Sequence, residues 1–329
     1  MDVVCRAGVW RSTLRHKAAI RPYSPCLSER TSAIAITALM PYGQEAEVTS
    51  DLTFESTKKI IATEDYRVQV NEAGSGHPVF MIHGTGPGAT GWGNFEPNIK
   101  VLSRRYRCIA VTMPGWGESS PQSVETGRDQ AETMRQLMDT MGIDRAAYVG
   151  NSMGGGISLA VTAMYPERVS HLITMGSGAP GMNYLSPAGP SEGIQILIDA
   201  YRDPSPENFK RLVKVMCFDS SNATDELAEQ RSKAAGAFPE HNKNWLDLWQ
   251  AGAFFVNSAE ITEALRQTSV PALIIHGRDD RTVHFEASLR SVALIPNSRL
   301  VLLNRCGHWA QLEHADEFNR LVDDFISNN

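Results

Sequence analysis

Ser152 has the surroundings of a catalytic nucleophile. It is the centre of the G-x-S-x-G pattern Gly150-Asn151-Ser152-Met153-Gly154, which follows a short apolar run and precedes a predicted helix. A sharp turn between strand and helix pushes the serine hydroxyl out of the backbone, and glycines are needed where a Cβ would collide with neighbouring chain. We therefore predict a catalytic role for Ser152 rather than a purely structural Gly/Ser turn.

The pattern occurs a second time, at Gly189-Pro190-Ser191-Glu192-Gly193. No apolar strand leads into this copy, and its prolines indicate irregular chain. Ser191 is therefore interpreted as the cap of a helix that begins near Ile194. The pattern alone is weak evidence, and the strand before Ser152 makes the first copy meaningful.

A serine hydroxyl needs a base to take its proton, and the base needs an acid that holds it in one tautomer. Asp280 and His308 each follow a predicted strand, which gives the chain order Ser, Asp, His. Asp279 competes with Asp280, and the residues alone barely separate the two. His308 follows the last strand and has Gly307 beside it, which distinguishes it from the other histidines near strand ends, namely His83, His276 and His284.

A glycine-dense loop, His83 to Gly88, follows the apolar run Val79–Ile82. It lacks the Lys and Ser/Thr of a phosphate-binding P-loop, and no helix N-terminus of that class is evident after it. The alternative is that its amides face the nucleophile. We therefore predict an oxyanion hole formed by the backbone N–H groups of Thr85 and Met153.

These side chains must be positioned by an alternation of strands and helices, which predicts an α/β fold with a doubly wound, mostly parallel sheet. The core is assigned to residues 63–182 and 257–329. The predicted buried strands are Val79–Ile82, Arg107–Met113, Ala147–Val149, Val169–Met175, Pro271–His276 and Leu300–Leu303. The predicted core helices are Arg128–Met141, Gly155–Tyr165 and His314–Ile326.

Residues 183–256 contain no β-rich run, and α/β periodicity resumes after them, so we interpret them as an inserted helical lid rather than an independent domain. The helices predicted there are Ile194–Tyr201, Pro206–Phe218, Thr224–Ala237 and His241–Ala253. Residues 1–40 show no clear periodicity. They are interpreted as a disordered tail, an organelle transit peptide, or sequence upstream of a natural start at Met40, with the transit peptide least favoured.

Composition excludes several classes of function. Residues 1–40 hold six basic and two acidic side chains, which leaves −10 on the rest of a chain whose total charge is −6. A body that acidic argues against nucleic-acid binding, and no apolar run is long enough to cross a bilayer. The five cysteines are scattered, which indicates reduced thiols, with Cys108 and Cys217 in the core, and a cytoplasmic location. We expect no metal and no cofactor, and a homo-oligomer of two or more copies.

Four stretches carry a resemblance to a known family: Gly84-Thr85-Gly86-Pro87-Gly88-Ala89 with Trp92 and Asn94, Gly150 to Gly155, Gly277-Arg278-Asp279-Asp280-Arg281, and Cys306 to Asn319. From about Gly74 to its C-terminus, the chain resembles the α/β-hydrolases that cleave carbon–carbon bonds in meta-cleavage products of aromatic degradation. The resemblance implies an α/β-hydrolase fold. It also implies hydrolysis of a 2-hydroxy-6-oxo-hexa-2,4-dienoate to 2-hydroxypenta-2,4-dienoate and a carboxylic acid.

The resemblance further implies roles for individual residues. The triad acid is the second of the paired aspartates, which selects Asp280, and Arg231 occupies the place of a lid arginine that grips the substrate carboxylate. The positions that border the dienoate are matched by Asn94, Asn151 and Trp309. Met216 stands where the family often has an aromatic residue, so the acyl group of the substrate stays open.

Each of these residues also has a structural interpretation. Arg231 could be a solvated helix residue, Trp309 a core residue, and Asn94 and Asn151 residues that stabilise turns. Two other functions compete with C–C hydrolysis: a carboxylesterase with the same triad, and a ligand-sensing receptor on the same fold.

Overall fold

The computed structural model describes residues 52–127, 129–179, 181, 184–187, 189–253 and 259–329. The prediction for residues 1–40 lies outside them. The described chain folds around an eight-stranded sheet with the order β1-β2-β4-β3-β5-β6-β7-β8. The strands are β1 Lys58–Ala62, β2 Arg67–Ala73, β3 His77–Ile82, β4 Tyr106–Thr112, β5 Ala146–Asn151, β6 Val169–Met175, β7 Ala272–Gly277 and β8 Ser298–Leu303.

Strands β3 to β8 pair in parallel, with Met81 opposite Val149 in the central pair β3–β5. The central strands β5 and β6 are buried along their whole length. Burial on both faces explains why they are continuous apolar runs rather than alternating ones. The prediction of a mostly parallel sheet is confirmed, and β1 and β2 add an antiparallel edge to it.

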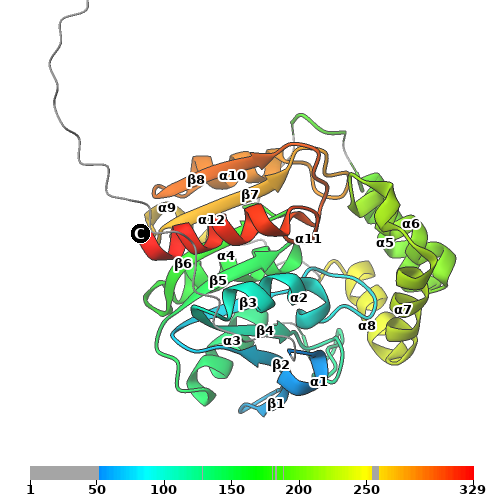
Figure 1. The fold of residues 1–329 in the computed structure, drawn as a ribbon, viewed down its shortest axis with the longest axis horizontal. Helices are drawn as coiled ribbons and strands as arrows, with labels where there is room; N and C mark the ends of the chain where they lie inside the picture. The colour runs from blue at the N-terminus through cyan, green and yellow to red at the C-terminus, as the bar shows by residue number, and fades with distance from the viewer. Residues whose placement is uncertain (1–51, 128, 180, 182–183, 188, 254–258) are drawn as a thin grey trace, which may run out of the picture. The chain divides into compact units, whose positions relative to one another are not determined.

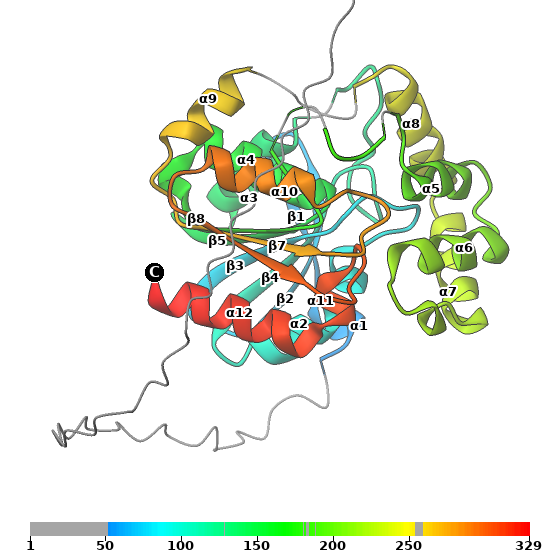
Figure 2. The same cartoon turned by 90° about the horizontal axis from the view of Figure 1, so that it is seen from above.

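Helices cover both faces of this sheet (Figures 1 and 2). One apolar cluster joins α2 and α12 to the sheet through residues such as Phe95 and Phe318, and a second joins α3 and α4 through residues such as Leu137 and Ile157. The helices outside the lid are α1 Phe54–Thr57, α2 Gly91–Leu102, α3 Gln130–Thr140, α4 Met153–Met164, α9 Ala259–Gln267, α10 Glu286–Leu294, α11 Ala310–Glu313 and α12 Ala315–Asn328, with the 3-10 turn Pro166–Arg168 after α4.

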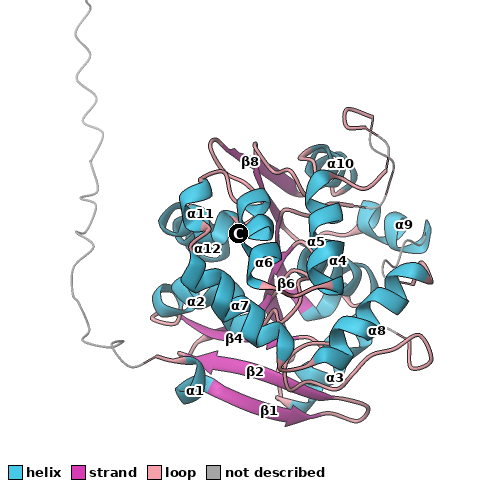
Figure 3. Ribbon diagram, turned by 90° about the vertical axis from the view of Figure 1, so that its right-hand side faces the viewer, coloured by secondary structure: helices cyan, strands magenta, loops and turns pink. Residues whose placement is uncertain are grey.

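Four helices between β6 and α9 lie together at one end of the sheet, and Figure 3 views the molecule from their side. They are α5 Glu192–Arg202, α6 Pro206–Met216, α7 Asp225–Gly236 and α8 Pro239–Gln250, with a 3-10 turn at Ser220–Asn222. Each predicted lid helix has its counterpart here. Ser191 caps α5 by accepting a hydrogen bond from the Ile194 N–H, so its interpretation as a cap is confirmed.

Two predictions about the start of the fold were wrong. The core does not begin at residue 63, because β1 precedes it and pairs with β2. A helix does follow the glycine-dense loop: α2 begins at Gly91, only three residues after Gly88. Among the described helices, none has both the length and the apolar character needed to cross a membrane.

Candidate active site

The turn at Ser152 has the geometry that its glycines predict. Ser152 has φ 53° and ψ −114°, one of two positive φ angles among the described non-glycine residues. A Cβ on Gly150 would lie 2.2 Å from the Gly154 carbonyl oxygen, and a Cβ on Gly154 would lie 2.0 Å from that of Ile82. Only glycine fits at either position, so the strained turn is imposed by close packing between β5, α4 and β3.

Asp280 and His308 meet in the buried interior between two strand ends. His308 follows β8, and its Nδ1 lies 2.7 Å from Asp280 Oδ2. The other oxygen, Oδ1, accepts the backbone N–H groups of Thr282 at 2.7 Å and Val283 at 2.9 Å. Burial alone would raise the pKa of Asp280, but the neighbouring His308 and the hydrogen bonds it receives hold that pKa well below its usual range. The carboxylate is therefore ionised and fixed in place beside the imidazole.

Ser152 and His308 both lie close to the end of β6, at Met175 and Gly176. The Ser152 N–H donates to the Met175 carbonyl at 2.8 Å, and a Cβ on Gly176 would stand 2.9 Å from His308 Nδ1. Between these described residues no hydrogen bond joins Ser152 Oγ to the His308 ring. Hydrogen bonds of catalytic groups are often long in unliganded hydrolases and tighten with substrate, so the arrangement is compatible with a triad.

The glycine-dense loop packs against the nucleophile turn. A Cβ on Gly84 would stand 2.8 Å from Asn151 Oδ1 and 3.1 Å from Ser152 Cβ. Thr85, the next residue, is held by a 3.0 Å hydrogen bond between its Oγ1 and the Tyr201 hydroxyl of lid helix α5. Met153 is the first residue of α4, where amide N–H groups point out of the helix and favour negative charge. Both predicted oxyanion donors thus belong to backbone beside Ser152.

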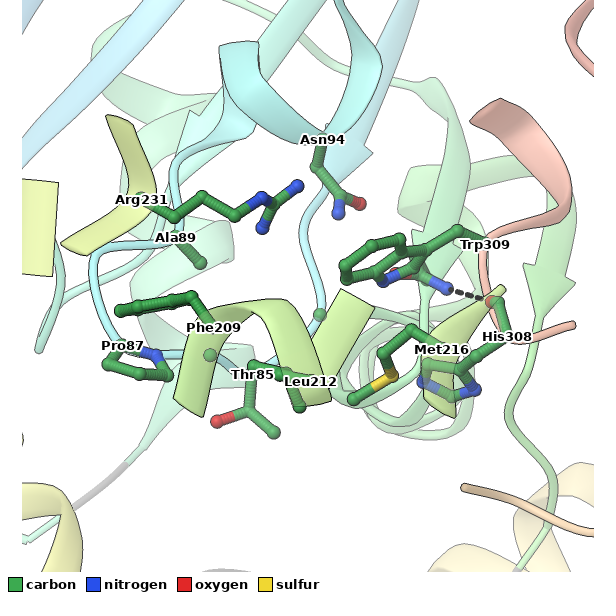
Figure 4. Close-up of a pocket in the computed structure, with 13 residues that line it drawn as sticks. Thr85, Pro87, Ala89, Asn94, Phe209, Leu212, Met216, Arg231, His308 and Trp309 are labelled. Carbon is green, nitrogen blue, oxygen red and sulfur yellow. Dashed lines mark hydrogen bonds between the residues drawn. The ribbon is translucent and has the colours of Figure 1, made fainter. Parts of the chain in front are cut away.

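Arg231 enters the site from lid helix α7 and points toward Asn94 and Trp309 (Figure 4). Its guanidinium carbon lies 4.6 Å from the Trp309 ring centroid. Its Nε is buried without a hydrogen-bond partner, and no carboxylate of the described residues lies within ion-pair distance. Burial lowers the pKa of Arg231 from its ordinary value. The interpretation as a solvated surface arginine is therefore wrong.

The two asparagines do not stabilise local turns. Asn94 lies inside α2, where its backbone carbonyl oxygen and its side-chain Oδ1 each accept a hydrogen bond from Gln311 Nε2 at 3.3 Å. Asn151 donates to the distant His308 carbonyl at 3.3 Å and buries its Oδ1 without a partner. Trp309 is buried, as a core residue would be, but its ring also borders the pocket (Figure 4).

Two cavities adjoin these groups. A narrow pocket is lined by polar and apolar side chains that include Asn94, Asn151, Met216, Arg231, His308 and Trp309. A larger cavity of about 1310 Å³ includes Ser152 and Met153 in its lining and is walled by apolar side chains such as Ile157, Leu197 and Trp249. Thr85, of the glycine-dense loop, lines both, so the two spaces adjoin at this residue.

Two side chains at this site, the half-buried Glu313 and the buried His276, were given no role from the sequence. Glu313 accepts the Gly307 N–H at 2.8 Å and the Phe218 N–H at 2.6 Å, which joins the histidine loop to the chain after α6. His276 lies 3.2 Å from Asp280 Oδ2 through its Nε2. Glu313 lies within the Cys306–Asn319 stretch that resembles the family. No sequence spacing predicts its contact with Gly307, or the contact of His276 with Asp280.

A strained serine turn and a buried Asp–His pair at the ends of parallel strands define a hydrolase of the α/β type. Residues 77–315 match the family described as alpha/beta hydrolase fold. A 2-hydroxy-6-oxononadienedioate/2-hydroxy-6-oxononatrienedioate hydrolase of Cupriavidus pinatubonensis is 38% identical over 84% of this chain and 98% of its own length. A 2-hydroxy-6-oxo-6-phenylhexa-2,4-dienoate hydrolase of Burkholderia cepacia is 38% identical over 85% and 99%.

The fold is similar to that of a solved relative as well. A meta-cleavage product hydrolase from Pseudomonas fluorescens IP01, in a serine-to-alanine variant with acetates bound, superposes with a TM-score of 0.69 at 32% identity, covering 82% of this chain and 97% of the other. The chain belongs to the α/β-hydrolase family and, within it, to the meta-cleavage product hydrolases. The predicted family and the predicted fold are therefore confirmed.

Proposed function

We propose that the protein hydrolyses a carbon–carbon bond in a 2-hydroxy-6-oxo-hexa-2,4-dienoate, releasing 2-hydroxypenta-2,4-dienoate and a carboxylic acid. The observation that carries the proposal is the guanidinium of Arg231, which has no carboxylate partner among the described residues and faces the pocket that His308 lines. Arg231 is half-buried with its Nε fully buried, and a guanidinium withdrawn from water without a counter-charge is costly, so an anionic substrate would supply the missing partner. The planar fork of arginine suits a carboxylate in particular.

The two cavities divide the substrate between them. The narrow pocket, with Arg231, Asn94 and Asn151, takes the carboxylate and the dienol. The larger cavity takes the acyl substituent, because its walls are mainly apolar near the nucleophile. The bond to be cleaved then lies between the two spaces, beside Ser152 and Thr85.

The chemistry requires a proton shift before cleavage. An unsaturated carbon is a poor leaving group, so the 2-hydroxyl proton is first removed and a proton is added at carbon 5, which gives a 2,6-diketone. Attack at the carbon 6 carbonyl then allows the bond between carbons 5 and 6 to break, with its electron pair delocalised onto the 2-oxo group. Arg231 stabilises the negative charge that grows on the 2-oxo group. An interaction that is stronger in the transition state than in the bound substrate raises the rate of the chemical step.

Each group of the site has a role in this scheme. His308 moves protons, and Asp280 keeps its ring in the tautomer whose Nε2 can accept one. Ser152 supplies the hydroxyl that attacks, or that helps His308 direct a water molecule to attack. The Thr85 and Met153 amides hold the oxyanion at carbon 6, an interaction worth about 3–4 kcal/mol per donor in comparable sites.

A carboxylesterase and a ligand-sensing receptor are the competing functions. A neutral ester has no use for a buried arginine, and a receptor would stop after about one event per protein. The test is to compare the rate at which the coloured dienolate of 2-hydroxy-6-oxo-6-phenylhexa-2,4-dienoate bleaches with the rate of p-nitrophenyl acetate hydrolysis. Many turnovers on the dienoate and a far lower kcat/KM on the ester are expected. The opposite ranking, or a single turnover, would refute the proposal.

Location and assembly complete the proposal. The three cysteines that the structure describes are free and buried, which favours a reducing compartment such as the cytoplasm. A homo-oligomer stays a prediction, to be checked by light scattering of the purified chain.

A further inference from the structure

A second imidazole touches the aspartate of the Asp280–His308 pair. His276 lies on β7, fully buried, four residues before Asp280. Its Nε2 stands 3.2 Å from Asp280 Oδ2 and 2.9 Å from the Val283 carbonyl oxygen, and its Nδ1 stands 2.6 Å from Ser288 Oγ on α10. The ring is therefore held at both nitrogens.

The partners of His276 determine where its hydrogen lies. A carboxylate oxygen and a carbonyl oxygen only accept hydrogen bonds, so Nε2 must carry a hydrogen to face both. The Nδ1 of the neutral ring then accepts the Ser288 hydroxyl hydrogen, for which the Ser177 carbonyl oxygen, 2.9 Å from Ser288 Oγ, competes. The Nε2–H of His276 is thus shared between the Val283 carbonyl oxygen, at 2.9 Å, and Asp280 Oδ2, at 3.2 Å, which is also the oxygen that lies 2.7 Å from His308 Nδ1.

Asp280 then has all of its acceptor capacity in use. Its Oδ1 takes two backbone N–H groups and its Oδ2 takes two imidazole N–H groups, from His308 and His276. Such an arrangement fixes the plane of the carboxylate. Each donor also attracts part of the carboxylate's negative charge, which leaves less of that charge to interact with the other donors.

Other charged groups around this pair have partners of their own. Arg281 donates to the Lys214 carbonyl, Asp279 lies beside Arg278, and His284 lies 3.8 Å from Glu286 of α10. From the loop after β8, the titratable neighbours are His308 and the buried thiol of Cys306, and burial raises the pKa of that thiol. Of the described side chains, only His276 and His308 donate to the Asp280 carboxylate.

We infer that His276 is a positioning residue for this enzyme: its Nε2–H orients the Asp280 carboxylate and weakens that carboxylate's hold on a proton of His308. The inference rests on the proposed function, in which Asp280 orients the catalytic histidine. Without the His276 donor, Asp280 Oδ2 would present more negative charge to His308 and stabilise the protonated form of its ring, although the two backbone N–H groups on Oδ1 would remain. The protonated ring cannot act as a base. As the pH is lowered, a variant without the His276 donor would therefore lose activity at a higher pH than the wild-type enzyme does.

The test replaces His276 with glutamine or asparagine, two amide side chains that differ by one methylene in length. The His276→Gln amide can reach the position of Nε2 and donate to Asp280, whereas the His276→Asn amide is about one methylene too short. The quantity measured is kcat/KM against pH, on the phenyl dienoate, with the melting temperature of each variant. His171→Asn is the matched control, because His171 is another buried histidine, on β6, that bonds Ser170 Oγ and the Asn329 carbonyl after α12 and forms no hydrogen bond with Asp280.

The expected result separates the two amides. In H276N the midpoint of the acidic limb rises by about half a pH unit or more, and kcat/KM at pH 7 falls on the order of tenfold, as the loss of a hydrogen bond to a charged group predicts. In H276Q the midpoint stays nearer the wild-type value, and in H171N it does not move even where the melting temperature falls. Equal midpoints in H276N and wild type, or equal shifts in H276N and H276Q, would overturn the inference.

Failure of the proposed function gives a different result. Asp280→Asn, measured alongside, loses activity if Asp280 orients His308. An active D280N would refute the role of Asp280 itself, whereas an inactive D280N with an unshifted H276N would refute only the role of His276.

Discussion

The guanidinium of Arg231, on a lid helix, stands over the ring of Trp309, the residue that follows His308 in the core. Their separation of 4.6 Å is within the range of a cation–π contact, which contributes about 0.5–2 kcal/mol depending on burial. The lid and the histidine loop therefore meet at the point where the substrate carboxylate is proposed to bind. An electron-rich ring face stabilises the cation but cannot replace a carboxylate.

Replacing Arg231 should weaken binding of the dienoate more than it weakens the fold. Arg231→Gln removes a charged donor, so kcat/KM on the phenyl dienoate should fall about 10- to 100-fold, with a higher KM from weaker carboxylate binding and a lower kcat from the lost stabilisation of the growing charge. Arg231→Lys keeps the charge without the planar fork and should lie between Gln and wild type. Arg211→Ala, on the exposed side of α6, is the control and should change kcat/KM less than threefold. An R231Q enzyme with wild-type KM would contradict carboxylate binding here.

Ser152→Ala should separate binding from hydrolysis. Without the hydroxyl, the dienoate still meets Arg231 and the narrow pocket, so its absorption spectrum should change on mixing while bleaching slows by about 10³-fold or more. The measurement is stopped-flow absorbance with enzyme in excess.

Ser191→Ala is the matched control for that substitution, because Ser191 occupies the second G-x-S-x-G copy and caps α5. Its loss should cost about 1 kcal/mol of stability and leave bleaching within a few-fold of wild type. Equal, mild effects of both alanines on turnover would count against Ser152.

The serine turn and the order Ser, Asp, His could be predicted because each depends on a short local pattern. Gly150 and Gly154 around a serine predict a tight turn, and the apolar run before them predicts a buried strand. Assigning Asp280 rather than Asp279 needed the resemblance to a family. In the structure, Asp280 bonds His308, whereas Asp279 lies beside Arg278.

Helix α2 could not be predicted in the same way. It contains Gly91, Gly93 and Pro97, three residues with poor helix propensity. The reason for Gly91 is tertiary: a Cβ there would stand 2.6 Å from the Ala110 carbonyl carbon on β4. Packing against the sheet outweighs the low helix propensity of these residues. The contact between Gly91 and β4 cannot be predicted from the sequence of residues 91–102 alone. The His276–Asp280 and Glu313–Gly307 contacts were missed for the same reason.

The buried Asp280 carboxylate should make stability depend on pH. Its folded pKa lies below the unfolded value, which is about 3.9, so the unfolded chain takes up a proton first as the pH falls. The stabilisation is therefore fully present above about pH 5 and is lost through and below pH 4. Urea unfolding of wild type and Asp280→Asn at pH 7, 5 and 3.5 should show a free-energy difference that shrinks at the lowest pH.

Asp279→Asn is the control for that experiment, because the Asp279 side chain is partly exposed and forms only a local ion pair with Arg278. Exposed pairs contribute about 0–1 kcal/mol, so D279N should change neither activity nor the pH dependence by much. D280N should lose activity by roughly 10⁴-fold, since an amide favours the wrong histidine tautomer. Loss of activity in D279N with retention in D280N would reverse the assignment.

The larger cavity offers a direct test of where the acyl group binds. Gly156 lies on α4 and lines this cavity, and a Cβ there would meet no atom within 4 Å. Gly156→Ala should therefore stabilise the helix by about 0.5–1 kcal/mol without narrowing the space. Gly156→Phe would place a ring inside it. The ratio of kcat/KM for the 6-phenyl dienoate to that for the 6-methyl dienoate should fall about tenfold or more in G156F and stay near the wild-type value in G156A. If G156F folds with an unchanged ratio, the acyl group does not occupy this cavity.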